Sequence, residues 1–210
     1  MPRSRTATAS LNVWPAFTDA MLAFVLVLVL VLVFQVARQI KIDTGDLGGQ
    51  KVRADIAVVE ALVGTLPDVE ILKESETTRV ITFGASTLFA PASASVQPTG
   101  QAILQRLATE ITSRDVTRER GGTLYQIEVS GHTDNTRINT YQFQSNWELS
   151  TARASNVVRF LAEQGGIDAA RVKMSAAGYG EFAPKSTNAS DAGRADNRRI
   201  EMKLYFGVTQ

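Results

Sequence analysis

The sequence predicts a single N-terminal transmembrane helix followed by an α+β domain with helices on one face of a small mixed sheet. Two observations support this. A long apolar segment lies near the N-terminus, and from about residue 68 strand-like segments of period two alternate with amphipathic helical segments. The predicted organisation is a tail (1–12), a membrane span (13–37), a linker and helix (38–67) and the α+β domain (68–210).

The apolar segment has the length of a membrane span. Every residue from Ala20 to Phe34 is apolar. As a helix, Ala20 to Ala37 would extend roughly 27 Å, close to the thickness of the hydrocarbon core of a bilayer. The segment is longer than the apolar part of a signal peptide, and no small-residue cleavage site follows it. We therefore interpret it as an uncleaved anchor.

The composition excludes several kinds of chemistry. The formal net charge of +1 gives no strong attraction to nucleic acid. The chain has no cysteine, which excludes disulfides, thiolate catalysis and cysteine zinc sites. His132 is the only histidine, which argues against a histidine-based metal cluster. We expect neither a metal nor a cofactor.

A helix is predicted between the span and the domain. Residues 38–50 are polar and rich in glycine, which is typical of a short linker. After them, apolar residues recur on one helical stripe, and Pro67 ends the pattern. This helix either packs on its own domain, which the pattern slightly favours, or pairs with a second copy in a dimer. The stripe consists of Val52, Ile56, Val59, Val63 and Leu66.

Within the domain, the apolar spacing predicts four strands and two helices. The predicted helices are 98–111 and 146–163, and a polar loop is expected at 183–196. The predicted strands are 79–83, 124–130, 172–176 and 199–206.

Polar residues concentrate where predicted strands end and helices begin, which is where binding residues usually lie. The segments are 130–135, 145–154 and 193–199. An aspartate there can bind an ammonium, and an arginine can bind a carboxylate through two hydrogen bonds, so the set suits a zwitterionic ligand. Each residue also has a purely structural interpretation: a helix cap at Ser145 or Asn146, a braced turn at Asp134, a surface ion pair at Arg198.

Catalysis is not expected. His132 and Asp134 are two residues apart, and Ser130 and Ser150 carry hydroxyl groups. However, the sequence has no nucleophile elbow, no recognisable oxyanion loop and no metal-ligand set. We therefore expect a protein that is not an enzyme.

Four motifs in order resemble the OmpA-like peptidoglycan-binding domain over residues 78–206: GHTDN, SNWELSTARA, GYGEFAP and GRADNRR. The spelling SNWELSTARA is similar to the MotB branch. The resemblance implies that Asp134 holds the amine of diaminopimelate in the wall peptide and that Arg153 holds its carboxylate. It assigns supporting roles to Thr133, Asn146 and Arg198. The segment between Asp134 and Leu149 is longer than in plain OmpA domains and could cover the groove.

A second resemblance concerns WPAFTDAMLAF at the start of the span. It is similar to MotB-type stator subunits and to the ZorB subunit of Zorya anti-phage systems, in which one essential acid precedes an apolar helix; Asp19 falls on that acid. The resemblance implies an ion-driven rotary motor in which two copies of this chain, a homodimer, sit inside five multi-span A-type (MotA- or ZorA-like) subunits. Protons are favoured over sodium ions, and the short tail and linker favour a Zorya-type motor over a flagellar one.

The same resemblance implies a location. It places the chain in the bacterial inner membrane as a single-pass protein in contact with lipid, with the N-terminus in the cytoplasm and the C-terminal domain in the periplasm, bound to peptidoglycan. Charge alone favours this orientation only slightly, because Arg3 and Arg5 precede the span while Arg38 and Lys41 follow it.

The position of Asp19 separates two hypotheses, of which the first is a subunit of an ion-driven motor and the second is a static tether. If the helix begins near Leu11, Asp19 lies about 12 Å into it. A charge in lipid costs ~2.5–3.5 kcal/mol on insertion scales, so such acids usually mark ion routes. Alternatively, Asp19 is an interfacial N-cap of a span that begins at Ala20. The second hypothesis makes the protein a static tether between the inner membrane and peptidoglycan.

Overall fold

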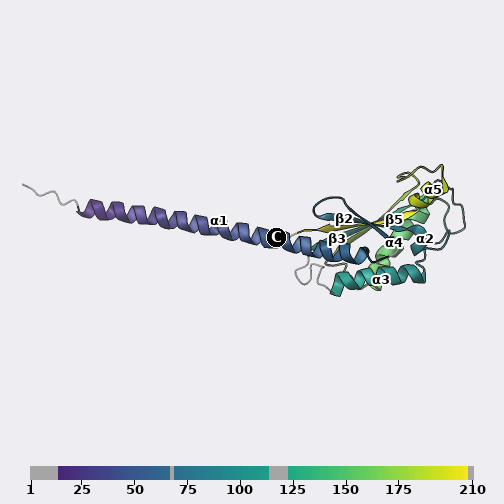
Figure 1. Cartoon of the computed structure of the whole chain (residues 1–210), viewed down its shortest axis with the longest axis horizontal. Helices are drawn as coiled ribbons and strands as arrows, with labels where there is room; N and C mark the ends of the chain where they lie inside the picture. Colours follow the sequence, from purple (N-terminus) through teal and green to yellow (C-terminus); the bar gives the residue numbers. More distant parts are fainter. Residues whose placement is uncertain (1–13, 67–68, 114–122, 208–210) are drawn as a thin grey trace, which may run out of the picture. The chain divides into compact units, whose positions relative to one another are not determined.

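The computed structural model describes residues 14–66, 69–113 and 123–207, and its first helix is unusually long (Figure 1). Helix α1 (Trp14–Val63) has 50 residues. The chain forms two compact units, Met1–Leu47 and Gly48–Gln210. The predicted tail, residues 1–12, lies outside the described residues.

The N-terminal unit contains a helix of membrane-spanning length. Among the described residues, Phe17–Gln39 is the one stretch that is long and apolar enough to cross a membrane. Its 23 residues correspond to about 35 Å of helix. The apolar side chains of this stretch are exposed on the isolated chain, as expected of a segment whose surroundings are lipid. The predicted N-terminal apolar helix is thereby confirmed.

The linker predicted at residues 38–50 is wrong, because α1 continues through it without a break. Gly48 and Gly49 each cost about 1 kcal/mol relative to alanine inside a helix. The segment lies between a long apolar helix and a helix packed in a core. Continuing the helix therefore keeps the backbone hydrogen bonds without a new and costly nucleation step. The C-terminal compact unit accordingly begins at Gly48, whereas the predicted domain began at residue 68.

The stripe predicted for residues 51–66 packs on its own domain. Its five apolar residues, Val52 to Leu66, are buried in the main hydrophobic core together with Leu62. Two polar contacts hold the same stretch. The Asp55 carboxylate accepts hydrogen bonds from the backbone N–H and the hydroxyl of Thr123, at 3.0 and 2.9 Å. The Glu60 carboxylate accepts one from Arg79 Nε at 2.5 Å.

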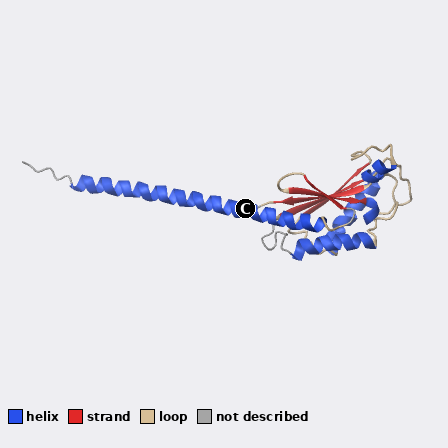
Figure 2. Ribbon diagram, in the orientation of Figure 1, coloured by secondary structure: helices blue, strands red, loops and turns tan. Residues whose placement is uncertain are grey.

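A five-stranded mixed sheet forms the centre of the domain (Figure 2). The strand order is β1-β2-β5-β3-β4, with β3 and β4 parallel and the other neighbours antiparallel. The strands are β1 (Val69–Lys73), β2 (Thr78–Gly84), β3 (Leu124–His132), β4 (Lys173–Gly180) and β5 (Arg199–Phe206). Strand β1 was not predicted.

Helices cover one face of this sheet (Figures 1 and 2). The long helices are α3 (Pro98–Ser113) and α4 (Asn146–Glu163), and the short ones are α2 (Ala85–Leu88) and α5 (Asp191–Asn197). Alternate strand residues such as Ile81, Met202 and Leu204 point into the core between sheet and helices. The predicted α+β fold is confirmed. The expected loop at 183–196 is wrong in its last part, where α5 begins.

Two glycines let the first turns of α4 lie directly on the sheet. A Cβ atom on Gly131 of β3 would lie 2.2 Å from the backbone oxygen of Ser150, and one on Gly178 of β4 would lie 2.1 Å from Thr151 Oγ1. Real Cβ atoms do not approach so closely, so both positions require glycine. This close packing brings the start of α4 to the C-terminal end of β3.

Candidate ligand-binding site

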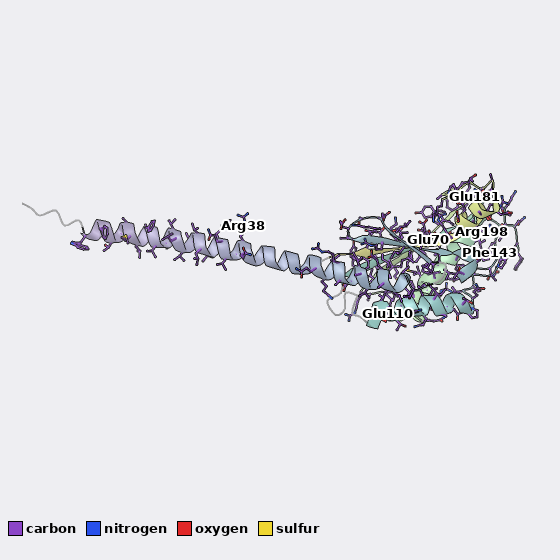
Figure 3. All side chains as sticks on the ribbon, in the orientation of Figure 1. Arg38, Glu70, Glu110, Phe143, Glu181 and Arg198 are labelled. Carbon is purple, nitrogen blue, oxygen red and sulfur yellow. The ribbon has the colours of Figure 1, made fainter. Side chains whose placement is uncertain are left out.

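All five residues predicted for the domain site line one pocket of about 440 Å³. Thr133 and Asp134 directly follow β3, Asn146 and Arg153 come from α4, and Arg198 directly follows α5. In Figure 3, Arg198 lies at the same end of the domain as Phe143 and Glu181. The fold therefore brings together residues up to 65 positions apart in the sequence, as the motifs predicted.

The Asp134 carboxylate is buried and already has two partners. One oxygen, Oδ1, accepts a hydrogen bond from the backbone N–H of Thr136 at 2.9 Å, so Asp134 does brace a turn. The other, Oδ2, lies 2.5 Å from Nη1 of Arg198. The Arg198 side chain is 45% exposed, whereas that of Asp134 is 8% exposed. A ligand ammonium that binds Asp134 must therefore share its Oδ2 with Arg198 or displace this more exposed partner.

Arg153 is a buried cation that no carboxylate neutralises within the described residues. It is 5% exposed. Its Nε donates to the carbonyl of Ser93 at 2.8 Å, its Nη2 donates to that of Ala90 at 3.4 Å, and the guanidinium lies over the Phe89 ring, 5.1 Å from the centroid. Burial, and then the positive charge of Arg198, lower the pKa of Arg153 to about 10, against the opposing effect of Asp134. The group stays charged at neutral pH and is placed to bind an anion.

Asn146 and Thr133 hold the pocket in shape. The Asn146 amide donates to the carbonyls of Thr136 and Asp134, at 3.1 and 3.4 Å, and to the Glu181 carboxylate. The Thr133 hydroxyl donates to the Asp134 carbonyl at 2.9 Å. The amide nitrogen of Asn146 and the hydroxyl of Thr133 thus donate to protein groups, so both side chains position the site around Asp134.

Helix α4 is capped by Ser145, so the capping interpretation holds there and not at Asn146, which is the first helical residue. The Ser145 hydroxyl accepts from the backbone N–H of Glu148 at 3.3 Å, and the Glu148 carboxylate accepts from that of Gln144 at 2.6 Å. This reciprocal arrangement resembles a capping box.

The longer segment after Asp134 forms one wall of the pocket. Three of its residues, Thr136, Arg137 and Ile138, line the cavity. Phe143 is buried in a small cluster with Ala94 and Leu149, and Ile138 packs against it. This satellite core fixes the segment beside the groove.

The opposite wall was not predicted from the sequence. It is built largely from small or apolar residues in the first turn of α2 and just after its end, namely Ala85, Ser86, Phe89, Ala90, Pro91 and Ala92. Small and apolar side chains do not by themselves indicate a binding site in a sequence. Trp147, which gives the motif its MotB-like spelling, does not line the pocket; it is half-exposed and stacks on Phe182, with 5.3 Å between ring centroids.

Ser150 and His132, two of the residues considered for catalysis, are buried and make contacts within the domain. Ser150 is fully buried, donates to the Trp147 carbonyl at 3.0 Å and accepts from the Gly180 N–H at 3.0 Å. His132 is buried and stacks on Tyr179, with 5.2 Å between centroids. Burial, and then the charge of Arg199, lower the pKa of His132 to about 4 against the opposing effect of Glu201, so the ring is neutral at pH 7.

The buried His132 should make stability pH-dependent. Its pKa lies below the unfolded value of about 6.5, so between pH 6.5 and 4 the unfolded chain binds a proton that the folded chain excludes. The free energy of unfolding should therefore fall as the pH falls, by about 3 kcal/mol at pH 4 from this group. His132→Phe keeps a ring against Tyr179 and removes the titration. Urea unfolding at pH 4.5 and 7 should show a smaller pH dependence for the variant; parallel profiles would contradict the assignment.

The predicted Asp19 lies inside a helix. Helix α1 begins at Trp14, so Asp19 is about 8 Å along it and not at its N-cap. The N-cap alternative is therefore wrong for this helix. Leu11, the start assumed for the deeper position, lies outside the described residues. Asp19 falls within the apolar stretch Phe17–Gln39.

These features define a class of protein: a membrane-length helix joined to an α+β domain with an arginine-rich pocket. Residues 88–198, just over half of the chain, match the family described as the OmpA family. The chain belongs to this family.

Relatives within the family include motility proteins. Motility protein B of Bacillus subtilis is 47% identical over 78 residues, which are 37% of this chain and 29% of that protein. This chain therefore covers less than a third of that relative. The similarity agrees with the MotB-like spelling of the motifs and confirms the resemblance to the MotB branch.

Two solved structures with the same fold share more than a quarter of their aligned residues with this chain. The cell wall anchor of the T6SS from Pseudomonas aeruginosa is 36% identical, with a TM-score of 0.56 over 66% of this chain and 88% of that one. A MotB-like protein from Desulfovibrio vulgaris is 26% identical, with a TM-score of 0.61 over 76% of this chain and 99% of that one.

Proposed function

We propose that this protein is the B subunit of an ion-driven motor and that its C-terminal domain anchors the motor to peptidoglycan. In this proposal the apolar helix crosses the bacterial inner membrane once, with the N-terminus in the cytoplasm and the domain in the periplasm. Similarity to motility protein B and the presence of a membrane-length helix support the motor class. The chain acts by binding and by carrying an ion, without covalent chemistry.

The observation that carries wall binding is the buried, unneutralised guanidinium of Arg153. Burying a cation without a counterion is costly, and a ligand carboxylate that pairs with it recovers part of that cost. The carboxylate of Asp134, which lines the same pocket, takes the ligand ammonium. The Asp134 carboxylate and the Arg153 guanidinium, which line a common cavity, suit a zwitterion such as the free centre of diaminopimelate. The similarity to the cell wall anchor of the T6SS is consistent with this ligand.

Asp19 is the proposed ion carrier. It is the only acid in the stretch Phe17–Gln39. Acids at such positions usually face a protein interior or a water path. A multi-span A-type subunit would supply that path, with five copies around a homodimer of this chain. We propose protons as the ion, and a Zorya-type anti-phage defence motor as the setting, because the segment between span and domain is short.

A static tether is the second candidate function. The similarity to the cell wall anchor of the T6SS favours it, because that structure is described as an anchor and shares 36% identity with this chain. The two functions share the pocket and differ in what surrounds α1.

The composition of the native membrane complex distinguishes them. Gentle detergent extraction followed by native mass measurement or imaging should give five copies of a multi-span partner for two copies of this chain. Isolation of this chain alone or as a bare dimer would reject the motor and support the tether.

A further inference from the structure

We propose that Arg137 binds a second carboxylate of the ligand, which makes the pocket selective for wall peptides with an additional free carboxylate beside the zwitterionic centre. This inference rests on the proposed binding of diaminopimelate through Asp134 and Arg153. It assigns a ligand contact to a residue that the motifs did not single out.

Arg137 differs from the other arginines of the pocket in its lack of partners. Arg198 pairs with Asp134, and Arg153 donates to two backbone carbonyls. Arg137 lines the same cavity and is exposed, and within the described residues its side chain makes no hydrogen bond or ion pair. Its guanidinium therefore keeps all of its donors available for a ligand.

The backbone on both sides of Arg137 is held in place. On one side, the N–H of Thr136 donates to Asp134, and the Thr136 carbonyl accepts from Asn146 at 3.1 Å. On the other side, Ile138 packs against the cluster around Phe143. The backbone that carries the long cationic side chain of Arg137 is thus already ordered beside the pocket. This lowers the entropy cost of ordering this segment when a ligand binds.

The charge of the pocket indicates what Arg137 recognises. Among the described lining residues, one carboxylate, Asp134, faces three guanidinium groups, Arg137, Arg153 and Arg198, which gives a net charge of +2. A zwitterion has no net charge and leaves this excess unchanged. A ligand with one ammonium and two carboxylates reduces it, and a guanidinium binds carboxylate through two parallel hydrogen bonds.

Two small probes separate the two carboxylate sites. Diaminopimelate acetylated on one amine has one zwitterionic centre and one further carboxylate. In the matched amide, that further carboxylate is replaced by a neutral carboxamide of similar shape, which keeps only one acceptor oxygen. Calorimetric titration of the full-length protein in detergent should give about tenfold tighter binding of the acid than of the amide. Arg137→Gln should bind both compounds equally, with the affinity that the unaltered protein has for the amide.

A matched variant controls for the effect of changing the net charge of the protein. Arg171→Gln removes the same charge from a residue that does not line the pocket, and it should keep the preference for the acid. The unfolding midpoint of Arg137→Gln should equal that of the unaltered protein, because the side chain is exposed. A preference that persists in Arg137→Gln would overturn the assignment while leaving zwitterion binding intact. Absence of binding by either probe would instead reject the proposed wall-binding function and this inference with it.

Discussion

Arg153→Ala is expected to abolish the sedimentation of this protein with purified peptidoglycan. The guanidinium is buried, lacks an acidic partner among the described residues and faces the pocket. Truncating one partner of a buried charged hydrogen-bonded pair costs ~2–5 kcal/mol, so the affinity should fall by at least about 30-fold. The measurement is the fraction of full-length protein, in detergent, that pellets with sacculi at increasing salt.

Arg159→Ala is the matched control for this experiment. Arg159 lies on the same helix, α4, but lines a different cavity, so its loss removes an equal charge outside the site. Arg153 also holds the carbonyls of Ser93 and Ala90, and thermal unfolding must therefore show that the variant is folded. Arg153→Lys, which keeps the charge but not the fork, should bind with intermediate affinity. Undiminished sedimentation of a folded Arg153→Ala protein would reject the site.

Asp19→Asn is expected to stop ion flow and to leave wall binding unchanged. Asparagine has nearly the same shape as aspartate, but it neither takes up nor releases a proton at neutral pH. Proton uptake into vesicles that contain this chain and the proposed multi-span partner should therefore fall to the background rate. The same preparation should sediment with peptidoglycan as the unaltered protein does.

The control for Asp19 is an acid of the C-terminal domain. Asp191 is almost fully exposed at the start of α5, and Asp191→Asn should conserve both proton uptake and wall binding. If Asp19→Asn keeps full biological activity, the protein carries no ion through this residue, and the static tether becomes the better description.

The sequence predicted best those elements with strong periodicity and defined ends. Helix α4 occupies the predicted range, because its apolar stripe follows a Ser-x-x-Glu start at Ser145. Strand β5 also matches, because from Ile200 onward its residues alternate between buried and half-buried positions. Strand β1 has only five residues and one partner strand, so its short alternation gave no clear signal.

The site was predicted in part. The motifs identified the five polar residues, because charged and hydrogen-bonding side chains can be recognised directly in a sequence. They did not reveal that Arg198 pairs with Asp134, because that contact joins positions 64 apart. They also missed the wall around Phe89, whose role depends on where α2 places it. The continuity of α1 was missed because glycine-rich composition favours a linker locally, while packing of Val52 and its neighbours decides the outcome.

The single helix α1 determines how mechanical tension would reach the domain. A flexible linker would stretch under a pull and delay the transfer of force. Here the segment that could cross the membrane and the first core helix share one continuous backbone. Val52, Ile56 and Val59 lie in the core, and Asp55 is bonded to Thr123. A pull transmitted through this backbone would therefore bear on Val52, Ile56 and Val59, and through them on the packed interior of the domain.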